Sequence, residues 1–194
     1  ATKFGMDLDG RNGDDSGHRG SAAYVRTAIE ASLQRLGTDR VDLYQLHTPD
    51  PSTPIEETLG ALNELVIEGK VLAIGSSNLQ AWQVVDADWV SKTKGYASFV
   101  TAQNEYSLYN RTAETELAPA CVELGIGILP YFPIAYGLLT GKYRRGEGAP
   151  EGSRLAVQSH RLEAANWDTI EALEAFASAR GIPILELAIG GPAA

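Results

Sequence analysis

Polar and aromatic residues follow a series of short apolar runs in this sequence, at positions where a fold could gather them. Lys3 lies in the first run and His47 ends the second. The later runs are followed by Ser77-Asn78, by Gln103-Asn104-Glu105 and by Tyr131 to Tyr136. Lysine and histidine can take part in acid–base catalysis, and amide and hydroxyl groups can hold a ligand by hydrogen bonds. The series therefore predicts a catalytic or ligand-binding site.

Each of these positions, taken alone, also has a structural interpretation. A lysine near a chain end is usually solvated, and a histidine that ends an apolar strand is more often structural than catalytic. Ser77-Asn78 could cap the next helix, Gln103 could satisfy backbone groups, and Tyr131 with Phe132 could belong to the core. Five such positions in succession, each at the end of an apolar run, favour the functional interpretation.

The elements that would position these residues alternate along the chain. The helix with the clearest spacing covers residues 22–36, with Ser21 as its N-cap and Gly37 at its end. Thr53-Pro54-Ile55-Glu56 predicts the capping box of a second helix, which ends at Gly69. Further helices are expected over residues 81–91 and 113–124, and strands over residues 41–47, 71–75, 98–103 and 126–131.

The spacing of the strands indicates the fold class. Their starts recur at roughly 30 residues, which is typical of βαβ units and a parallel sheet. An open doubly wound sheet and a closed barrel both satisfy this spacing. A dinucleotide-binding doubly wound fold would carry a Gly-x-Gly-x-x-Gly turn after its first strand, and none is present there. We therefore expect an α/β fold of the (β/α)8 TIM barrel type, with about five of the eight β/α units in a single, partial domain over residues 1–194.

The remaining segments have weaker patterns. Residues 137–165 are rich in Gly, Pro, Arg and Glu and predict a long loop after the fifth strand. A helix is expected over residues 167–180, followed by an apolar element over residues 182–189. The polar loop from Met6 to Gly20 could cover the site at the strand ends.

Composition excludes several classes of function. The 194 residues are 44% hydrophobic and 21% charged, as in an ordinary globular domain, and the formal net charge of −9 argues against nucleic-acid and anionic-membrane partners. The single cysteine, Cys121, excludes an internal disulfide and fits a reducing compartment. No signal-peptide pattern begins the chain, and the apolar run 126–139 is shorter than the roughly 20 residues that span a bilayer. These features predict a cytoplasmic location, and no metal site is predicted.

Four motifs, taken in order, resemble those of the aldo-keto reductases, in particular their larger bacterial and potassium-channel-β-like branch. They are Tyr44-Gln45-Leu46-His47-Thr48-Pro49-Asp50, the segment Gly69 to Asn78, Gln103-Asn104-Glu105-Tyr106, and Pro130-Tyr131-Phe132-Pro133 with Gly137-Leu138-Leu139-Thr140-Gly141-Lys142-Tyr143. The likeness extends from Ala1 to about Leu187.

The resemblance implies an oxidoreductase that reduces aldehydes and ketones with NADPH. Family members use a Tyr, Lys, Asp and His tetrad, in which Lys3 matches the lysine and His47 the histidine. The lysine would lower the pKa of the tyrosine, and the histidine would orient and polarise the substrate carbonyl. The basic cluster Lys142, Arg144, Arg145 and Arg154 is a sensible counter-charge for the cofactor, with a solvated loop as its alternative. The implied cofactor-binding residues are Ser77, Asn78, Gln103, Tyr131, Phe132, Pro133, Ile134, Ala135, Gly137, Leu138, Lys142 and Arg154.

The sequence also departs from the family pattern. No Asp-x-x-x-x-Tyr segment precedes Lys3, so the tyrosine and aspartate of the tetrad have no match, and Leu187 to Pro192 replaces the family's continuation into a last strand. This polypeptide alone is therefore expected to fold poorly and to be inactive. The alternatives are a non-catalytic NADPH-binding module, like the potassium-channel β subunits, and an inactive fragment. His47 favours an enzyme, since those subunits usually carry Asn there. The resemblance leaves a homo-oligomer open.

Overall fold

The computed structural model describes residues 1–6 and 18–193, so most of the loop expected from Met6 to Gly20 lies outside the described residues. The chain forms two compact units. Unit 1 comprises residues 1–104 and 114–129, and unit 2 comprises residues 105–113 and 130–194. Each unit is described by itself below.

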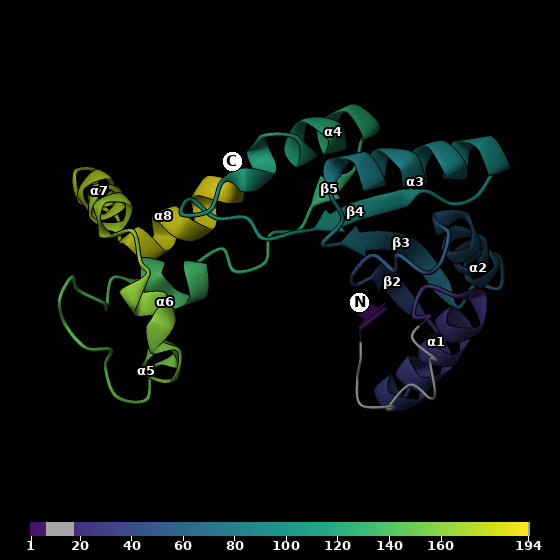
Figure 1. The fold of residues 1–194 in the computed structure, drawn as a ribbon, viewed down its shortest axis with the longest axis horizontal. Helices are drawn as coiled ribbons and strands as arrows, with labels where there is room; N and C mark the ends of the chain where they lie inside the picture. The colour runs from purple at the N-terminus through teal and green to yellow at the C-terminus, as the bar shows by residue number, and fades with distance from the viewer. Residues whose placement is uncertain (7–17, 194) are drawn as a thin grey trace. The chain divides into compact units, whose positions relative to one another are not determined.

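Unit 1 is built on a parallel sheet. In its described part, five strands are hydrogen-bonded in the order β1-β2-β3-β4-β5, which is also their order along the chain (Figure 1). Their bounds are Thr2–Phe4, Val41–Leu46, Val71–Ser77, Phe99–Gln103 and Gly127–Ile128. A doubly wound sheet reverses its strand order at a switch point, whereas a barrel adds each strand on the same side. The sequential order is that of a partial (β/α)8 barrel, the architecture that the absence of a Gly-x-Gly-x-x-Gly turn favoured over a doubly wound sheet.

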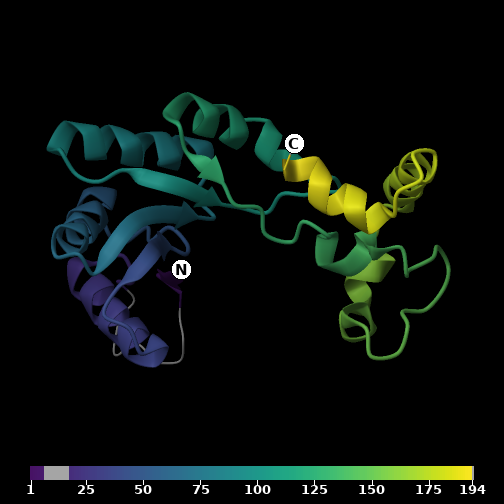
Figure 2. The same ribbon diagram turned by 180° about the vertical axis from the view of Figure 1, so that it is seen from behind.

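Four helices of unit 1 lie on one face of this sheet, and Figures 1 and 2 agree in this arrangement. They are α1 (Ala22–Leu36), α2 (Ile55–Ile67), α3 (Ala81–Lys94) and α4 (Leu117–Leu124). Val25 and Ile29 of α1 and Leu59 and Leu62 of α2 are fully buried. Tyr44 on β2 donates its hydroxyl to Val25 O on α1 at 3.2 Å. Burial of aliphatic stripes against a sheet is the main stabilising term of such a layer, and it leaves the opposite face of the strands for the site.

Both ends of α1 match the sequence prediction. The Ser21 hydroxyl accepts a hydrogen bond from Tyr24 N, and Gly37 adopts a left-handed conformation with φ 65°. A serine N-cap and a left-handed glycine satisfy backbone groups that the helix leaves unpaired. The predicted bounds of this helix, residues 22–36, are therefore confirmed.

The capping box predicted for α2 is wrong. The helix begins at Ile55 with Pro54 as its N-cap, and no side chain caps it. The Thr53 hydroxyl instead donates to Asp50 Oδ2 at 2.8 Å, and the Glu56 carboxylate pairs with Lys94 at 2.7 Å. Both side chains of the predicted box thus form charge-assisted contacts with other side chains, and neither caps the backbone N–H groups of the first turn.

Two boundaries differ from the prediction around prolines. The strand expected over residues 126–131 is limited to Gly127–Ile128, since Pro130 cannot donate to a strand ladder. The helix expected over residues 113–124 is divided into a 3-10 turn, Thr112–Glu114, and α4. Pro119 has no N–H and is tolerated only in the first helical turn, so α4 cannot extend far before it.

Unit 2 is helical. Its elements are a 3-10 segment η2 (Ala135–Thr140), α5 (Arg154–Val157), α6 (Ser159–Glu163), α7 (Trp167–Ser178), α8 (Ile184–Gly190) and a last 3-10 turn, Gly191–Ala193. The prediction of a long loop over residues 137–165 is therefore wrong in part. Leu139 and Leu155 from the short helical turns are fully buried against Ile170 of α7 and Ala188 of α8. Turns of this length carry too few residues to display a helical period.

No helix among the described residues is long and apolar enough to traverse a bilayer. The same part of the chain holds no group of three or more His, Cys, Asp or Glu side chains arranged to bind a metal ion.

Candidate functional site

Lys3 and His47 lie at the carboxyl ends of neighbouring strands in unit 1. Lys3 pairs in register with Gln45 on β2, and His47 follows the last residue of β2, where its backbone N–H donates to Phe4 O at 2.7 Å. Burial lowers the pKa of His47, and the positive charge of Lys3 lowers it further. The imidazole is therefore neutral at neutral pH, and it lies close enough to Lys3 to sense its charge.

Asn78 connects the ends of three strands. Its side-chain amide donates to His47 O at 2.9 Å, and its backbone N–H donates to Gln103 O at 3.1 Å. The residue has φ 59°, in the left-handed region that asparagine tolerates better than most residues. It also donates to the Ser77 hydroxyl at 3.2 Å. A residue that the family resemblance assigns to the cofactor thus also fixes the backbone beside the histidine.

Ser77 and Gln103 share the face that carries Lys3. They pair in register at the ends of β3 and β4. Ser77 is buried, and the Oε1 atom of Gln103 is buried with no hydrogen-bond partner among the described residues. A buried acceptor without a donor costs free energy, so this position suits a ligand that brings an N–H group. The carboxamide of a nicotinamide ring has such a group, and the residues present in unit 1 fit it.

Two residues of this face were not predicted as part of the site. Gln45 is buried, and its amide donates to Ser76 O at 3.4 Å. A Cβ atom on Gly75 would lie 2.3 Å from Thr101 Oγ1 and 3.2 Å from Gln45 Cγ. Gly75 therefore lets two polar side chains approach each other between Lys3 and the later strands. A glutamine and a glycine inside apolar strands were the signals that could have revealed them.

The Asp50 carboxylate organises the loop that follows His47. It accepts hydrogen bonds from Gly20 N at 2.7 Å, from Ser52 N at 2.9 Å and from the Thr53 hydroxyl at 2.8 Å. Burial raises the pKa of Asp50, but hydrogen bonds from Ser52, Gly20 and Thr53 outweigh it and lower the pKa to about 2. The Thr58 hydroxyl donates to Gly20 O at 2.7 Å. The loop after the histidine and the start of α1 are thus held together, a role that the sequence motif alone did not suggest.

In unit 2, the stretch after the fifth strand has an unusual backbone. Phe132, Ala135 and Tyr136 have φ values of 55°, 47° and 59° although none is glycine. Such conformations cost free energy and persist where the surroundings impose them, often at functional sites. The N–H of Ala135 donates to Phe132 O at 2.8 Å, and that of Gly137 to Ile134 O at 2.9 Å. These two N–H groups, which the resemblance assigns to the pyrophosphate stretch, are already engaged within the loop.

The start of this stretch is anchored at Tyr131. It forms an isolated parallel bridge with Glu105, and its ring meets that of Phe132 edge-on at 5.2 Å between centroids. Pro133 and Ile134 follow it, and Leu138 is buried in the core of unit 2. The residue predicted to stack on a nicotinamide is thus paired with Glu105 within unit 2.

The predicted basic cluster is divided by ion pairs. Arg144 pairs with Glu174 at 3.0 Å, and Arg145 pairs with Asp168 and Glu171 of α7 at 2.5 and 2.8 Å. Lys142 and Arg154 are exposed and have no ion pair among the described residues. The Arg154 guanidinium lies 5.9 Å from the centroid of the Phe132 ring, so it is near the strained stretch. Of the cluster, these two residues are the better candidates for a cofactor phosphate.

Comparisons with known proteins were made for the whole chain. The model of the aldo/keto reductase family matches residues 1–190. An oxidoreductase of Bacillus subtilis (strain 168), YrpG, is 36% identical over 202 residues, which cover 99% of this chain and 62% of that protein. Probable aldo-keto reductase 1 of Glycine max is 40% identical over 168 residues, with 87% of this chain and 46% of that protein covered. Aflatoxin B1 aldehyde reductase member 4 of Homo sapiens is 45% identical over 120 residues, with 62% and 36% covered.

The chain thus spans between 36% and 62% of the length of these three relatives. The motifs quoted from the sequence lie within the matched residues 1–190.

Proposed function

The chain belongs to the aldo/keto reductase family, and from this premise we propose that the protein reduces aldehydes or ketones to alcohols by hydride transfer from NADPH. The observation that carries the proposal is the neighbouring placement of Lys3 and a neutral His47 at adjacent strand ends. A neutral imidazole can hydrogen-bond a carbonyl oxygen without adding a full charge beside the lysine. Because the chain spans less than two thirds of its relatives' length, the proposal concerns the activity of the whole protein.

The residues of unit 1 have distinct roles in this proposal. NADPH would supply the hydride when it is bound. His47 would orient the substrate carbonyl, and Lys3 would favour proton release from a nearby hydroxyl donor through its positive charge. Gln103 would accept a hydrogen bond from the nicotinamide carboxamide, with Ser77 and Asn78 beside it.

Unit 2, taken by itself, carries the other residues that the family resemblance assigns to the cofactor. Tyr131 would stack on the nicotinamide ring, the stretch from Phe132 to Leu138 would follow the pyrophosphate, and Lys142 and Arg154 would pair with phosphate oxygens. Lys142 and Arg154 form no ion pair with the residues that the structure describes, and this supports their assignment to the phosphates.

This proposal has two alternatives: an inactive fragment of such a reductase and a non-catalytic NADPH-binding module. An inactive fragment of such a reductase would bind the cofactor without turnover. A non-catalytic NADPH-binding module would behave in the same way. The retained histidine at position 47 favours a reductase as the whole protein. A single partial domain and a cytoplasmic location, consistent with one cysteine, complete the proposal.

The proposal is tested by separating binding from turnover. NADPH binding to the purified chain would be followed by the change in NADPH fluorescence, and turnover by the loss of absorbance at 340 nm with 4-nitrobenzaldehyde. The cofactor site is supported if Gln103→Leu weakens NADPH binding and the matched control Gln34→Leu, at an exposed position, does not. Turnover would identify the chain as a reductase, and an absence of NADPH binding by a chain that circular dichroism shows to be folded would contradict the proposal.

A further inference from the structure

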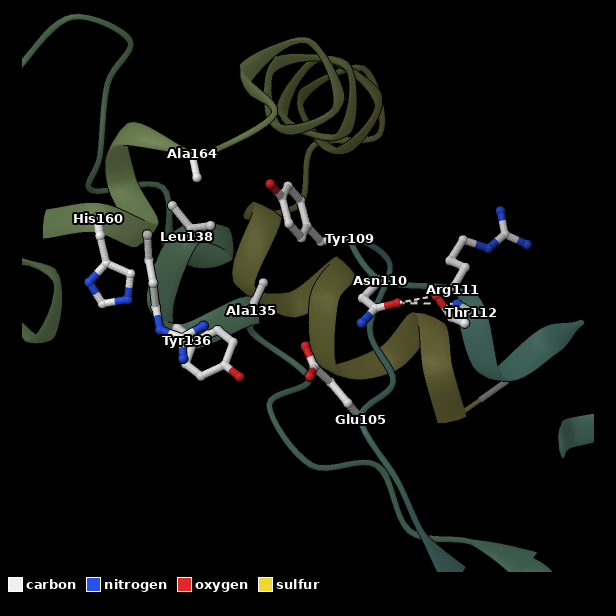
Figure 3. A pocket seen from close by; sticks show the side chains of 11 residues that line it. Glu105, Tyr109, Asn110, Arg111, Thr112, Ala135, Tyr136, Leu138, His160 and Ala164 are labelled. Atoms are coloured by element: carbon white, nitrogen blue, oxygen red, sulfur yellow. Dashed lines mark hydrogen bonds between the residues drawn. The ribbon is translucent and has the colours of Figure 1, made fainter. Parts of the chain in front are cut away.

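Unit 2 contains a cavity of about 500 Å³ that the proposed chemistry does not use. Its walls come from the segment after β4 and from η2 and α6. Figure 3 shows Tyr109, Tyr136 and the carboxylate of Glu105 around the same space. A cavity of this volume, with aromatic walls and a few polar groups, is of the size that holds a small organic ligand.

The polar group that stands out in this cavity is Arg161. Its guanidinium lies over the ring of Tyr136, 3.7 Å from the centroid. The Nε atom is buried and has no hydrogen-bond partner among the described residues. In the same part of the chain, no carboxylate forms an ion pair with this arginine, whereas Arg144 and Arg145 nearby in sequence are both paired. A guanidinium that lies against a ring, and whose buried Nε–H has no acceptor, is suited to bind an anion.

The stack on Tyr136 has a second consequence. An arginine normally loses side-chain entropy when it binds a ligand, but a guanidinium already held against an aromatic ring has lost much of it. The guanidinium is itself a planar group, and its N–H donors lie along its edges. A carboxylate, which is planar and has two acceptor oxygens, matches such an edge better than a spherical anion does.

The other walls limit the kind of carboxylate. Leu138 and Ala135 are apolar and buried, and the hydroxyl of Tyr109 is fixed because it accepts a hydrogen bond from Asn166 N at 2.8 Å. Glu105 brings a carboxylate to the cavity wall. This negative group disfavours a ligand with several negative charges and favours one with a hydrogen-bond donor.

We propose that this cavity binds a small aromatic carboxylate that also carries a hydroxyl group. The carboxylate pairs with Arg161, the ring packs against Tyr109 and Leu138, and the hydroxyl donates to Glu105. This binding site is additional to the reductase function and does not depend on it, because it lies within unit 2 and needs neither NADPH nor turnover. Ala135 and Leu138 also belong to the stretch assigned to the cofactor, so a bound carboxylate would lie beside that stretch.

The test is a titration of the purified 194-residue chain, without NADPH, with 4-hydroxybenzoate as the probe. Isothermal calorimetry is expected to give saturable binding with a Kd of about 1 mM or lower, as suits a ligand of this size. Arg161→Gln should weaken binding at least about tenfold, since it removes the charge and the paired donors. The matched control is Arg180→Gln, because Arg180 also lies over a ring, that of Phe176 at 3.4 Å, but is outside the cavity. This variant should bind within about twofold of the wild type.

A comparison of probes tests the same idea without any variant, so a variant that fails to fold does not prevent a decision. 4-Hydroxybenzamide has the same shape and no charge, and it should bind at least about tenfold more weakly than 4-hydroxybenzoate. Benzoate, which lacks the hydroxyl, should be weaker by a smaller factor. Inorganic phosphate should not compete. The proposal is overturned if the wild-type chain shows no saturable binding, if the amide binds as well as the acid, or if phosphate displaces the probe.

Discussion

The side-chain amide of Asn78 donates a hydrogen bond to the carbonyl oxygen of His47 at 2.9 Å, so the residue after β3 is joined to the residue after β2. This bond is possible because Asn78 adopts φ 59°, which turns its side chain back toward the neighbouring strand end. The position of the histidine is therefore set by a residue 31 positions later in the chain.

Replacement of Asn78 separates the contribution of its side-chain hydrogen bonds from that of its left-handed backbone conformation. Asn78→Gly keeps a backbone suited to positive φ and removes only the side-chain bonds, so it should lower the free energy of unfolding by about 1 kcal/mol. Asn78→Ala also places a Cβ with no compensating bond in the left-handed region and should cost about 2 kcal/mol. Urea denaturation followed by circular dichroism measures both. Equal losses in the two variants would contradict the strain argument.

Gly75 should tolerate no side chain. In Gly75→Ala the new Cβ would lie 2.3 Å from Thr101 Oγ1, and we expect a loss of about 1–3 kcal/mol in the free energy of unfolding. The double variant with Thr101→Ala should recover part of that loss. Gly60→Ala is the matched control. It lies inside α2 with its nearest neighbour, Tyr96, at 3.6 Å, and it should be stabilising by up to about 1 kcal/mol. A neutral Gly75→Ala would show that Thr101 can move away without cost.

Asp50 should contribute to stability at neutral pH and lose that contribution in acid. Its pKa is about 2 in the folded chain, against about 3.9 in an unfolded chain. The unfolded state therefore binds a proton first as the pH falls, and the stabilisation is present above pH ~4 and lost as the pH approaches 2. Because the carboxylate is partly exposed, a contribution of about 1 kcal/mol is expected.

The matching variant is Asp50→Asn, which is nearly isosteric and cannot ionise. The difference in urea midpoint between this variant and the wild type should be largest above pH 5 and should narrow toward pH 3. A difference that stays constant with pH would mean that the charge of Asp50 contributes nothing, and that the loop depends on shape alone.

The pKa of His47 should depend on the charge of its neighbour Lys3. Burial and the Lys3 charge hold the pKa of His47 below its usual 6.5. The unfolded chain takes up this proton at a higher pH than the folded one, so stability should fall as the pH falls through about 6.5 toward the folded pKa. Removal of the ammonium in Lys3→Met should raise the pKa of His47, although burial should still keep it below 6.5.

NMR titration of the imidazole Cε1–H signals measures this shift. An unchanged His47 titration in that variant would refute the electrostatic contact between the two residues.

Most of the fold of unit 1 follows from local patterns in the sequence. The helix over residues 22–36 was predicted with its correct bounds, because buried residues at helical spacing, a serine N-cap and a terminal glycine all act within one segment. The regular spacing of the strand starts predicted the parallel sheet, because this spacing is also visible in the sequence alone. The segments that were misassigned, such as residues 137–165, fold into turns of a few residues whose burial depends on distant helices.

The sequence by itself determined the alternation of strands and helices, the parallel sheet and which polar residues follow the strands, since these depend on short-range periodicity. Only the tertiary structure decided that Gly75 brings Gln45 and Thr101 together, that Asp50 ties the loop after His47 to Gly20, and that Arg161 lies over Tyr136 with an unused donor. These contacts join residues far apart in the chain or in irregular segments. They are set by packing, and no periodic pattern of residues encodes them.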